Sequence, residues 1–181
     1  QAEAVAQACP RWHDSLDSVP DGPAIILANE FIDALPIRQL IRSIDGWRER
    51  LVTVDEETGD LAYGATPAPS LAEALVYPPL RRHAKPGDIA EICPAGLTIA
   101  KDLGRRAQRD GSVSLLIDYG HPVTAIGDTL QALGGHRPVH PLAAPGETDL
   151  TAHVDFDALG RAARESGAAV HGPKNQGAFL K

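Results

Sequence analysis

An apolar run that ends in a cluster of polar residues constrains this chain more than any other stretch. Residues 24–28 read AIILA, and Asn29, Glu30 and Asp33 follow before Pro36. A short continuous apolar run is typical of a strand that is buried on both faces of a parallel sheet. In open sheets of this kind, ligands bind beyond the carboxyl ends of the strands. We therefore expect a functional site where this strand ends, at Asn29 and Glu30.

The composition is typical of a single globular domain from a reducing compartment. The chain has 181 residues, of which 43% are hydrophobic, and a net charge of −7. The acidic balance argues against a nucleic-acid-binding protein, which usually carries a basic surface. No apolar run reaches the roughly 18 residues of a membrane span. The cysteines Cys9 and Cys93 form no CxxC pair, which disfavours a disulfide framework. Because the chain begins at Gln1 and lacks methionine, we expect a fragment of a longer protein.

Strands and helices that alternate along the second half of the chain predict an α/β fold. Expected strands lie at 89–93, 112–117, 129–133 and 168–172. Expected helices run from Pro94 to about residue 107, with Gly111 beyond the end, and from 156 to 166, with Asp155 as the cap. Residues 136–147 are proline-rich and are expected to form a loop.

An antiparallel β-element is expected between the first strand and this alternating part. Asp45-Gly46 lies between the β-prone runs 39–44 and 47–54, and this dipeptide is a strong hairpin signal. Residues 61–63 continue the element, and a weak helix is expected at 71–75. We place this insert at about residues 38–87. Near the N-terminus we expect the end of a helix at 1–8 and an edge strand at 11–16.

A second polar cluster follows the strand expected at 112–117. Asp118 and Tyr119 come directly after it. If the two strands are neighbours, the carboxylates at their ends line one crevice, where they could bind a cofactor hydroxyl, hold a cationic substrate or accept a proton. The alternative is structural: Asn29 and Glu30 bond loop amides, and Asp118 caps a turn.

Histidines offer weaker signals. His153 lies two residues before Asp155 and is either a general base or substrate ligand, or part of a helix-capping segment. His136 and His140 have helical spacing, but Pro138 opposes a helix there and no set of acidic or cysteine ligands lies nearby, so we predict no metal site. The sequence contains no G-x-S-x-G, P-loop or G-x-G-x-x-G pattern.

Several longer motifs, in order, resemble one known family. The segment NEFIDALP at 29–36 resembles the NEFxDALP signature of the MidA-type methyltransferases. Further matches are GWRE at 46–49, IDYGH at 117–121, DTL at 128–130, PG at 145–146 and DLTAHVDF at 149–156. The matches extend from Asn29 to Phe156 and cover most of the chain. One departure is Asn175-Gln176, where the family usually has Thr-Gln.

The resemblance implies an S-adenosylmethionine-dependent methyltransferase with a class I, Rossmann-like sheet. The family includes a mitochondrial complex I assembly factor that methylates an arginine of a complex I subunit. Residues 1–181 would then be a partial methyltransferase domain, the C-terminal part of the sheet together with the inserted β-element. The glycine-rich cofactor loop belongs to the N-terminal half of the family's fold, which we expect to be absent from this chain.

Under this resemblance, each strand-end residue receives an expected role. Glu30, Asp33 and Asp118 would be catalytic and hold a guanidinium group, since carboxylates form bidentate hydrogen bonds with guanidinium groups. Asn29, Tyr119 and His153 would bind the substrate, and Asn29 and Glu30 would also contact S-adenosylmethionine.

The expected partner is a protein substrate, such as a respiratory complex I subunit or its homologue, with neither nucleic acid nor a membrane span involved. The expected location is the cytoplasm of a bacterium, or the mitochondrion if the source is eukaryotic. One alternative is a non-catalytic protein-binding module of the same fold that acts in complex assembly. Another nucleotide-dependent Rossmann-type enzyme has little support, because no glycine-rich loop is present.

Overall fold

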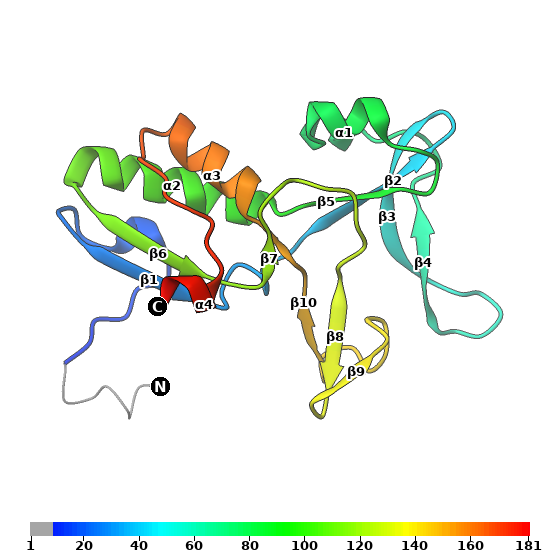
Figure 1. Cartoon of the computed structure of the whole chain (residues 1–181). Helices are drawn as coiled ribbons and strands as arrows, with labels where there is room; N and C mark the ends of the chain where they lie inside the picture. Colours follow the sequence, from blue (N-terminus) through cyan, green and yellow to red (C-terminus); the bar gives the residue numbers. More distant parts are fainter. Residues whose placement is uncertain (1–8) are drawn as a thin grey trace.

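The computed structural model describes residues 9–181 and shows a mixed α/β fold (Figure 1). Its helices are α1 (Pro78–His83), α2 (Pro94–Asp110), α3 (Phe156–Glu165) and α4 (Gln176–Phe179). Its strands up to β6 are β1 (Ile25–Asn29), β2 (Arg38–Ser43), β3 (Gly46–Val54), β4 (Leu61–Ala65), β5 (Ile89–Ile92) and β6 (Val113–Ile117). The strands that follow β6 are β7 (Gly120–His121), β8 (Gln131–Gly134), β9 (Arg137–Val139), β10 (Asp149–Thr151) and β11 (Val154–Asp155). The helix end expected at 1–8 lies outside the described residues.

The parallel pair β1–β6 leads into both predicted polar clusters and confirms two predicted strands. Its register runs from Ile25 opposite Val113 to Asn29 opposite Ile117. The expectation that the first strand is buried on both faces is wrong for the described residues, because Ile25 is 83% and Leu27 is 70% exposed. Helices α2 and α3 lie on one side of the pair (Figure 1), and the side chains that point to the other face remain accessible.

Helices α2 and α3 begin and end where the sequence predicts. Pro94 occupies the first turn of α2, and Gly111 follows its end with a φ of 70°, a left-handed conformation that glycine adopts without strain. The Asp155 side chain accepts a hydrogen bond from the Ala158 amide at 2.9 Å and caps α3. The helices pack closely at Gly104, where an added Cβ would lie 2.6 Å from the Ala163 carbonyl oxygen.

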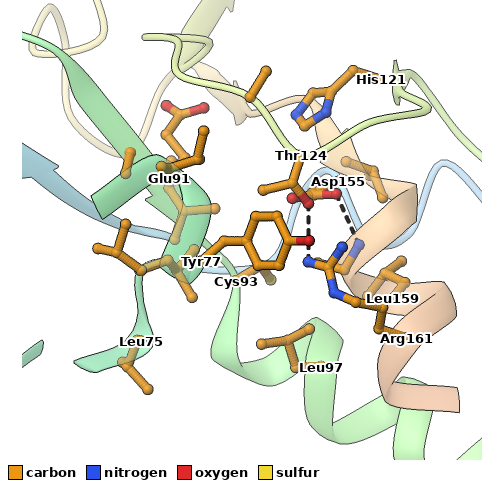
Figure 2. A pocket seen from close by; sticks show the side chains of 18 of the residues that line it. Leu75, Tyr77, Glu91, Cys93, Leu97, His121, Thr124, Asp155, Leu159 and Arg161 are labelled. Atoms are coloured by element: carbon orange, nitrogen blue, oxygen red, sulfur yellow. Dashed lines mark hydrogen bonds between the residues drawn. The ribbon is translucent and has the colours of Figure 1, made fainter. Parts of the chain in front are cut away.

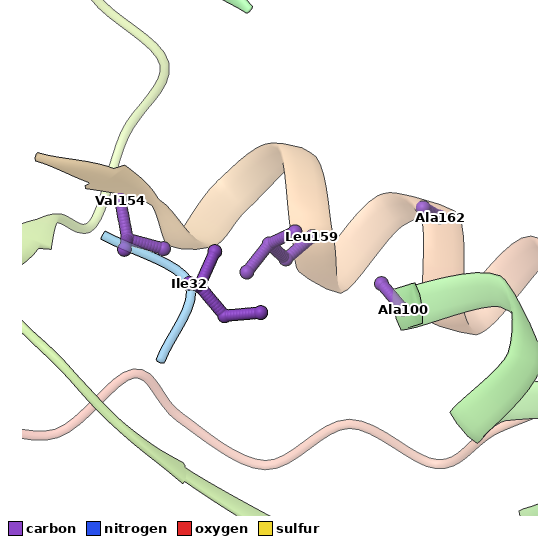
Figure 3. Packing of buried hydrophobic residues seen from close by; sticks show 5 residues of the cluster. All are labelled: Ile32, Ala100, Val154, Leu159 and Ala162. Carbon is purple, nitrogen blue, oxygen red and sulfur yellow. The ribbon is translucent and has the colours of Figure 1, made fainter. Parts of the chain in front are cut away.

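The core beneath these helices also holds the loop that follows β1. Figure 3 shows Ile32 from that loop beside Leu159 of α3, in a buried cluster that also includes Ala100 of α2. The buried members of this cluster are Ile32, Ala100, Val154, Leu159 and Ala162. Because burying an aliphatic side chain stabilises a fold by about 1.5–3 kcal/mol, Ile32 anchors the strand-end loop to the helical layer.

The inserted β-element is a four-stranded antiparallel sheet in the order β4-β3-β2-β5. Its hairpin confirms the prediction, although Ser43 pairs with Gly46, so the two-residue turn is Ile44-Asp45 rather than Asp45-Gly46. Fully buried Leu40, Trp47 and Val76 form the centre of its own core. The stretch expected as a weak helix is a 3-10 helix at Leu71–Leu75, and α1 follows it.

Strand β5 belongs to this inserted sheet, which corrects the expected alternation. The sequence places a main-sheet strand at 89–93, but β5 pairs antiparallel with β2, with Arg38 opposite Ile92. A short apolar run does not reveal which strand it will pair with. The chain therefore leaves the insert along β5 and enters α2 directly at Pro94.

Three other local predictions are wrong or incomplete. Residues 168–172 form no strand, since no strand of the described residues pairs with them. The edge strand expected at 11–16 is absent, and a 3-10 turn at Leu16–Ser18 follows instead. The stretch 136–147 is only partly loop, because β9 pairs with β8 in the small sheet β10-β8-β9. No helix in the described part of the chain is long and apolar enough to cross a membrane.

Candidate active site at the carboxyl ends of two parallel strands

The carboxyl ends of β1 and β6 bring the two predicted polar clusters together. Asn29 lies beside Ile117, so the polar segments that follow the two strands start at the same sheet edge. The Glu30 amide donates a hydrogen bond to the Ile117 carbonyl at 2.8 Å, and Glu30 has a φ of 45°. A non-glycine residue in this left-handed region is strained by about 1–2 kcal/mol and occurs where its surroundings impose it. The chain thus turns sharply at Glu30, whose side chain is exposed.

Asp118 organises the loop that follows β1. Its Oδ2 atom accepts hydrogen bonds from three successive backbone amides, those of Phe31 at 3.2 Å, Ile32 at 3.0 Å and Asp33 at 3.3 Å. Its Oδ1 atom accepts a hydrogen bond from the Tyr119 amide at 2.9 Å. Both carboxylate oxygens are therefore used within the protein. This geometry matches the structural alternative stated for Asp118, in which its carboxylate holds a turn.

Asp33 lies in the most acidic part of this edge. Its burial raises the pKa of its carboxyl group, and the nearby charges of Asp118 and Glu30 raise that pKa further. Backbone hydrogen bonds act in the opposite direction. Since carboxylates at close range repel one another, the cluster formed by Glu30, Asp33 and Asp118 favours a cation beside it.

The segment that carries His153 joins this edge through its backbone. The Ala152 amide donates to the Asp33 carbonyl at 3.0 Å, and the Val154 amide donates to the Tyr119 carbonyl at 2.8 Å. The His153 residue between them is exposed. The structure therefore places all six predicted residues on three connected segments, with Asn29 and Tyr119 also exposed.

Glu91 is a structurally central residue that the sequence reasoning missed. Its Oε1 atom accepts hydrogen bonds from Gln39 Nε2 at 2.7 Å, the Thr129 amide at 3.0 Å and the Leu130 amide at 3.2 Å. Its Oε2 atom accepts from the Thr129 hydroxyl, and that oxygen in turn accepts from the His153 amide at 2.9 Å. Glu91 thus links the inserted sheet to the segment of His153. The available signals were a carboxylate within the apolar run 89–93 and the DTL motif.

Arg50 extends this network across the inserted sheet. Its Nη1 atom donates to Asp128 Oδ2 at 2.7 Å and to Gln39 Oε1 at 3.2 Å, and its guanidinium stacks 3.6 Å from the centre of the Tyr63 ring. Gln39 is only 6% exposed, and its amide nitrogen also donates to Asp128. Asp128 is exposed, but the Gln39 amide and the Arg50 guanidinium have their partners in place, and such a polar network rigidifies a structure. The network therefore couples the insert to the loop at 128–130.

A pocket of about 460 Å³ lies between the insert and helices α2 and α3 (Figure 2). Its lining residues come from the loop after β1, the end of the 3-10 helix, Tyr77 and α1, strand β5 and Cys93, α2, the loop at 121–129, and the segment from Ala152 into α3. His153 and Ile32 both line it, so the pocket adjoins the strand-end site. The Cys93 thiol lies in its wall, and burial raises the pKa of that thiol, which disfavours the reactive thiolate.

The histidine pair considered for metal binding does not form a ligand set. Within residues 9–181, no group of three or more His, Cys, Asp or Glu side chains could hold a metal ion. His140 instead lies with its ring centre 5.8 Å from that of Tyr63.

Comparison with known proteins assigns the chain to a family. A family model described as "Putative S-adenosyl-L-methionine-dependent methyltransferase" matches residues 1–174. The chain belongs to this family. The methyltransferase family was the one indicated by the NEFIDALP and IDYGH motifs, so that resemblance is confirmed.

Curated relatives of this methyltransferase family are named protein arginine methyltransferase NDUFAF7, mitochondrial. The chain is 39% identical to the Danio rerio protein over 173 residues and 37% identical to the Homo sapiens protein over 171 residues. Each match covers 94% of this chain, but only 39% and 37% of the two relatives. The chain thus spans less than half the length of the curated relatives it matches.

Two solved structures from Burkholderia thailandensis share the fold. One is a COG1565 superfamily member bound to S-adenosyl-homocysteine, with a TM-score of 0.71 and 28% identity over 92% of this chain and 43% of that one. The other, a native structure from the same superfamily, has a TM-score of 0.74 and 26% identity over 92% of this chain and 46% of that one. S-adenosyl-homocysteine is what S-adenosylmethionine becomes when it gives up its methyl group.

Proposed function

We propose that the full protein is an S-adenosylmethionine-dependent methyltransferase that acts on an arginine of a protein substrate. The observation that carries this proposal is the acidic strand end: Glu30, Asp33 and Asp118 lie together at the carboxyl edge of β1 and β6. Family membership supports the cofactor, and the names of the NDUFAF7 relatives support the arginine substrate. A carboxylate cluster suits a guanidinium, which forms paired hydrogen bonds with carboxylates.

The fold proposed around this site is the C-terminal part of a class I, Rossmann-like sheet. Residues 1–181 would be a partial methyltransferase domain, with the insert at about 38–87. The parallel pair β1–β6 and the crossover helix α2 between its strands support this proposal. Sites in such sheets lie beyond the carboxyl ends of the strands.

The residues at this edge fit one side of a site for S-adenosylmethionine. The exposed Asn29 amide and Glu30 carboxylate supply a donor and acceptors at the strand end, as the amino and hydroxyl groups of the cofactor require. When bound, the cofactor supplies a methyl group activated by a sulfonium. The acidic edge would also favour its positive charge. We assign Asn29 and Glu30 to this contact.

The proposed roles of the chain's own residues follow from their exposure and from the hydrogen bonds that they already make. Glu30 is exposed and is held at a strained turn, so it binds and orients the guanidinium. Asp33, whose pKa is raised, is suited to accept the proton that the substrate nitrogen loses as it gains a methyl group. Asp118 is a positioning residue, because its oxygens hold the loop. Tyr119 and His153 lie beside this edge and contact the substrate.

The proposed partner is a protein, in particular a respiratory complex I subunit or its bacterial homologue. The support is the resemblance to the assembly factor family and the name of the curated relatives. In this proposal the protein acts in the mitochondrion if its source is eukaryotic, as those relatives are named mitochondrial, and in the cytoplasm if it is bacterial.

The decisive test replaces the Glu30 carboxylate in the full-length protein. We expect Glu30→Gln to lower the transfer of labelled methyl groups to arginine at least about a hundredfold, the loss typical of a removed charged contact in a transition state. The purified wild-type or variant protein would be added to extract of a strain that lacks it, so that the extract supplies unmethylated substrate. Mass spectrometry would then measure the labelled methyl groups on arginine. Glu147→Gln, an exposed glutamate outside the site, is the matched control. Unchanged incorporation with Glu30→Gln would refute the assignment.

A further inference from the structure

The pocket beside the strand end has an apolar interior of a size that takes a side chain. Its volume is about 460 Å³, within the range of about 300–1,000 Å³ typical of ligand sites. The apolar residues that line it include Ile32, Val76, Ile92, Leu97, Ile126 and Leu159. Two of these, Ile32 and Leu159, also belong to the buried core under α3, so this wall is firmly supported.

A contact between Tyr77 and Arg161 fixes the two sides of the pocket relative to each other. Figure 2 shows Tyr77, from the insert, extending toward Arg161 on α3, and the guanidinium lies 4.2 Å from the centre of the ring. Arg161 is held in turn by Asp157 and by the Thr124 hydroxyl, the latter at 3.0 Å. A cation over an aromatic face contributes about 0.5–2 kcal/mol. This contact therefore joins the insert side of the pocket to α3.

The pocket adjoins the proposed methyl-transfer site. Ile32, which lines it, follows Glu30 by two residues, and its amide is bound by Asp118 at 3.0 Å. His153 lines the pocket from the other segment of the site. A residue seated in the pocket would thus hold its neighbours in the same polypeptide near the acidic edge.

The charges around the pocket favour a basic polypeptide. Lining carboxylates belong to Glu91, Asp155 and Glu165, and lining cations to Lys101 and Arg161. The Arg161 charge is already paired with Asp157. The side chains that line the pocket therefore carry a net negative charge, of the same sign as the strand end.

We infer that this pocket binds an apolar side chain of the protein substrate that lies beside basic residues in its sequence. The inference rests on the proposed function and adds the determinant of substrate choice. The apolar residue occupies the pocket beside the Tyr77–Arg161 contact, while its basic neighbours lie against the lining carboxylates and the strand end. The site would then select arginines by the residue next to them.

A peptide-binding experiment with the full-length protein tests the pocket directly. The probe is the fluorescein-labelled peptide Gly-Arg-Leu-Arg-Gly-Gly, and the comparison peptide has serine in place of leucine. Binding is measured by fluorescence anisotropy without cofactor. Burial of a leucine side chain gives about 1.5–3 kcal/mol, so we expect the leucine peptide to bind at least about tenfold more tightly.

Variants of the pocket wall identify where the leucine binds. Ala125→Trp, at an exposed position that lines the pocket, should raise the Kd of the leucine peptide about tenfold, as a filled pocket loses that burial. Leu75→Ser, at an exposed position that lines the pocket, should raise the Kd of the leucine peptide about threefold. This second variant keeps the test valid if Ala125→Trp fails to fold. The matched control Ala169→Trp, at an exposed alanine that does not line the pocket, should leave the Kd unchanged.

The outcomes separate this inference from the proposed function. Equal affinity for the two peptides, or full binding by both Ala125→Trp and Leu75→Ser, would overturn the pocket assignment. A preference of the wild-type protein for the leucine peptide that Ala125→Trp removes would support the pocket assignment. That support would hold even if Glu30→Gln left methyl transfer intact and so refuted the catalytic assignment.

Discussion

The carboxylate of Asp118 gives the sharpest test of how the strand-end loop is held. We consider Asp118→Ala, which removes the acceptor of the Phe31, Ile32 and Asp33 amides together with that of the Tyr119 amide. Hydrogen bonds to a charged group contribute about 1.5–3 kcal/mol each when well formed. The three bonds to Oδ2 share one atom at 3.0–3.3 Å and the loop is partly exposed, so we expect a total loss of about 2–4 kcal/mol.

Hydrogen exchange of the loop amides is the most direct assay of this loss. A cost of about 2 kcal/mol in local opening corresponds to roughly thirtyfold faster exchange at residues 31–33, and about 3 kcal/mol to more than a hundredfold. Amides of β2 and β3, which do not contact Asp118, provide the internal reference. Asp149→Ala, at an exposed aspartate of β10, is the control variant.

The isosteric variant Asp118→Asn separates the charge from the shape. If its oxygen faces the three loop amides, its NH2 group faces the Tyr119 amide, and that donor loses its acceptor. We expect a loss intermediate between wild type and Asp118→Ala, about 1–2 kcal/mol. Exchange at residues 31–33 that is within twofold of wild type in Asp118→Ala would refute the view that this carboxylate holds the loop.

Two further predictions concern the same edge. Gly120→Ala should lower the free energy of unfolding in urea by about 1–3 kcal/mol, because the new Cβ would overlap the Val154 carbonyl across the β7–β11 pair. A stability equal to wild type would show that this pair can separate freely. Asp33→Asn should stabilise the protein at pH 7, since the raised pKa means that folding disfavours the charged form. That gain in stability should shrink as the pH falls through the raised pKa of Asp33, because the wild-type carboxyl group becomes neutral there. A difference in urea midpoint between Asp33→Asn and wild type that is the same at pH 7 and pH 4 would contradict this prediction.

Most local elements of the fold could be predicted from the sequence, because the residues that start and end each element lie within or next to it. Pro94 and Gly111 mark the two ends of α2, and Asp155 caps α3 as expected. The apolar run before Asn29 forms a strand, and the turn after Ser43 lies within one residue of the predicted position. Such features depend on backbone dihedrals and nearby donors and acceptors, which the adjacent side chains control.

The pairing of strands was less predictable, because it depends on distant partners. Ile89–Ile92 looks like any short buried strand, yet it joins β2 in the insert rather than the parallel pair. Residues 168–172 have the composition of a strand but lack a partner within residues 9–181. A strand satisfies its backbone only by hydrogen bonds to another strand, so its composition alone does not decide whether it forms or where.

The site was divided in the same way between sequence and tertiary structure. By itself the sequence determined which polar residues follow the apolar runs, namely Asn29, Glu30, Asp33, Asp118 and Tyr119, and which family they indicate. Only the tertiary structure decided that the Asp118 carboxylate accepts hydrogen bonds from loop amides, that Glu91 connects the insert to the segment of His153, and that a pocket lies beside them. The physical reason is that hydrogen-bond partners and cavities arise between segments far apart in the chain, whereas residue types are local.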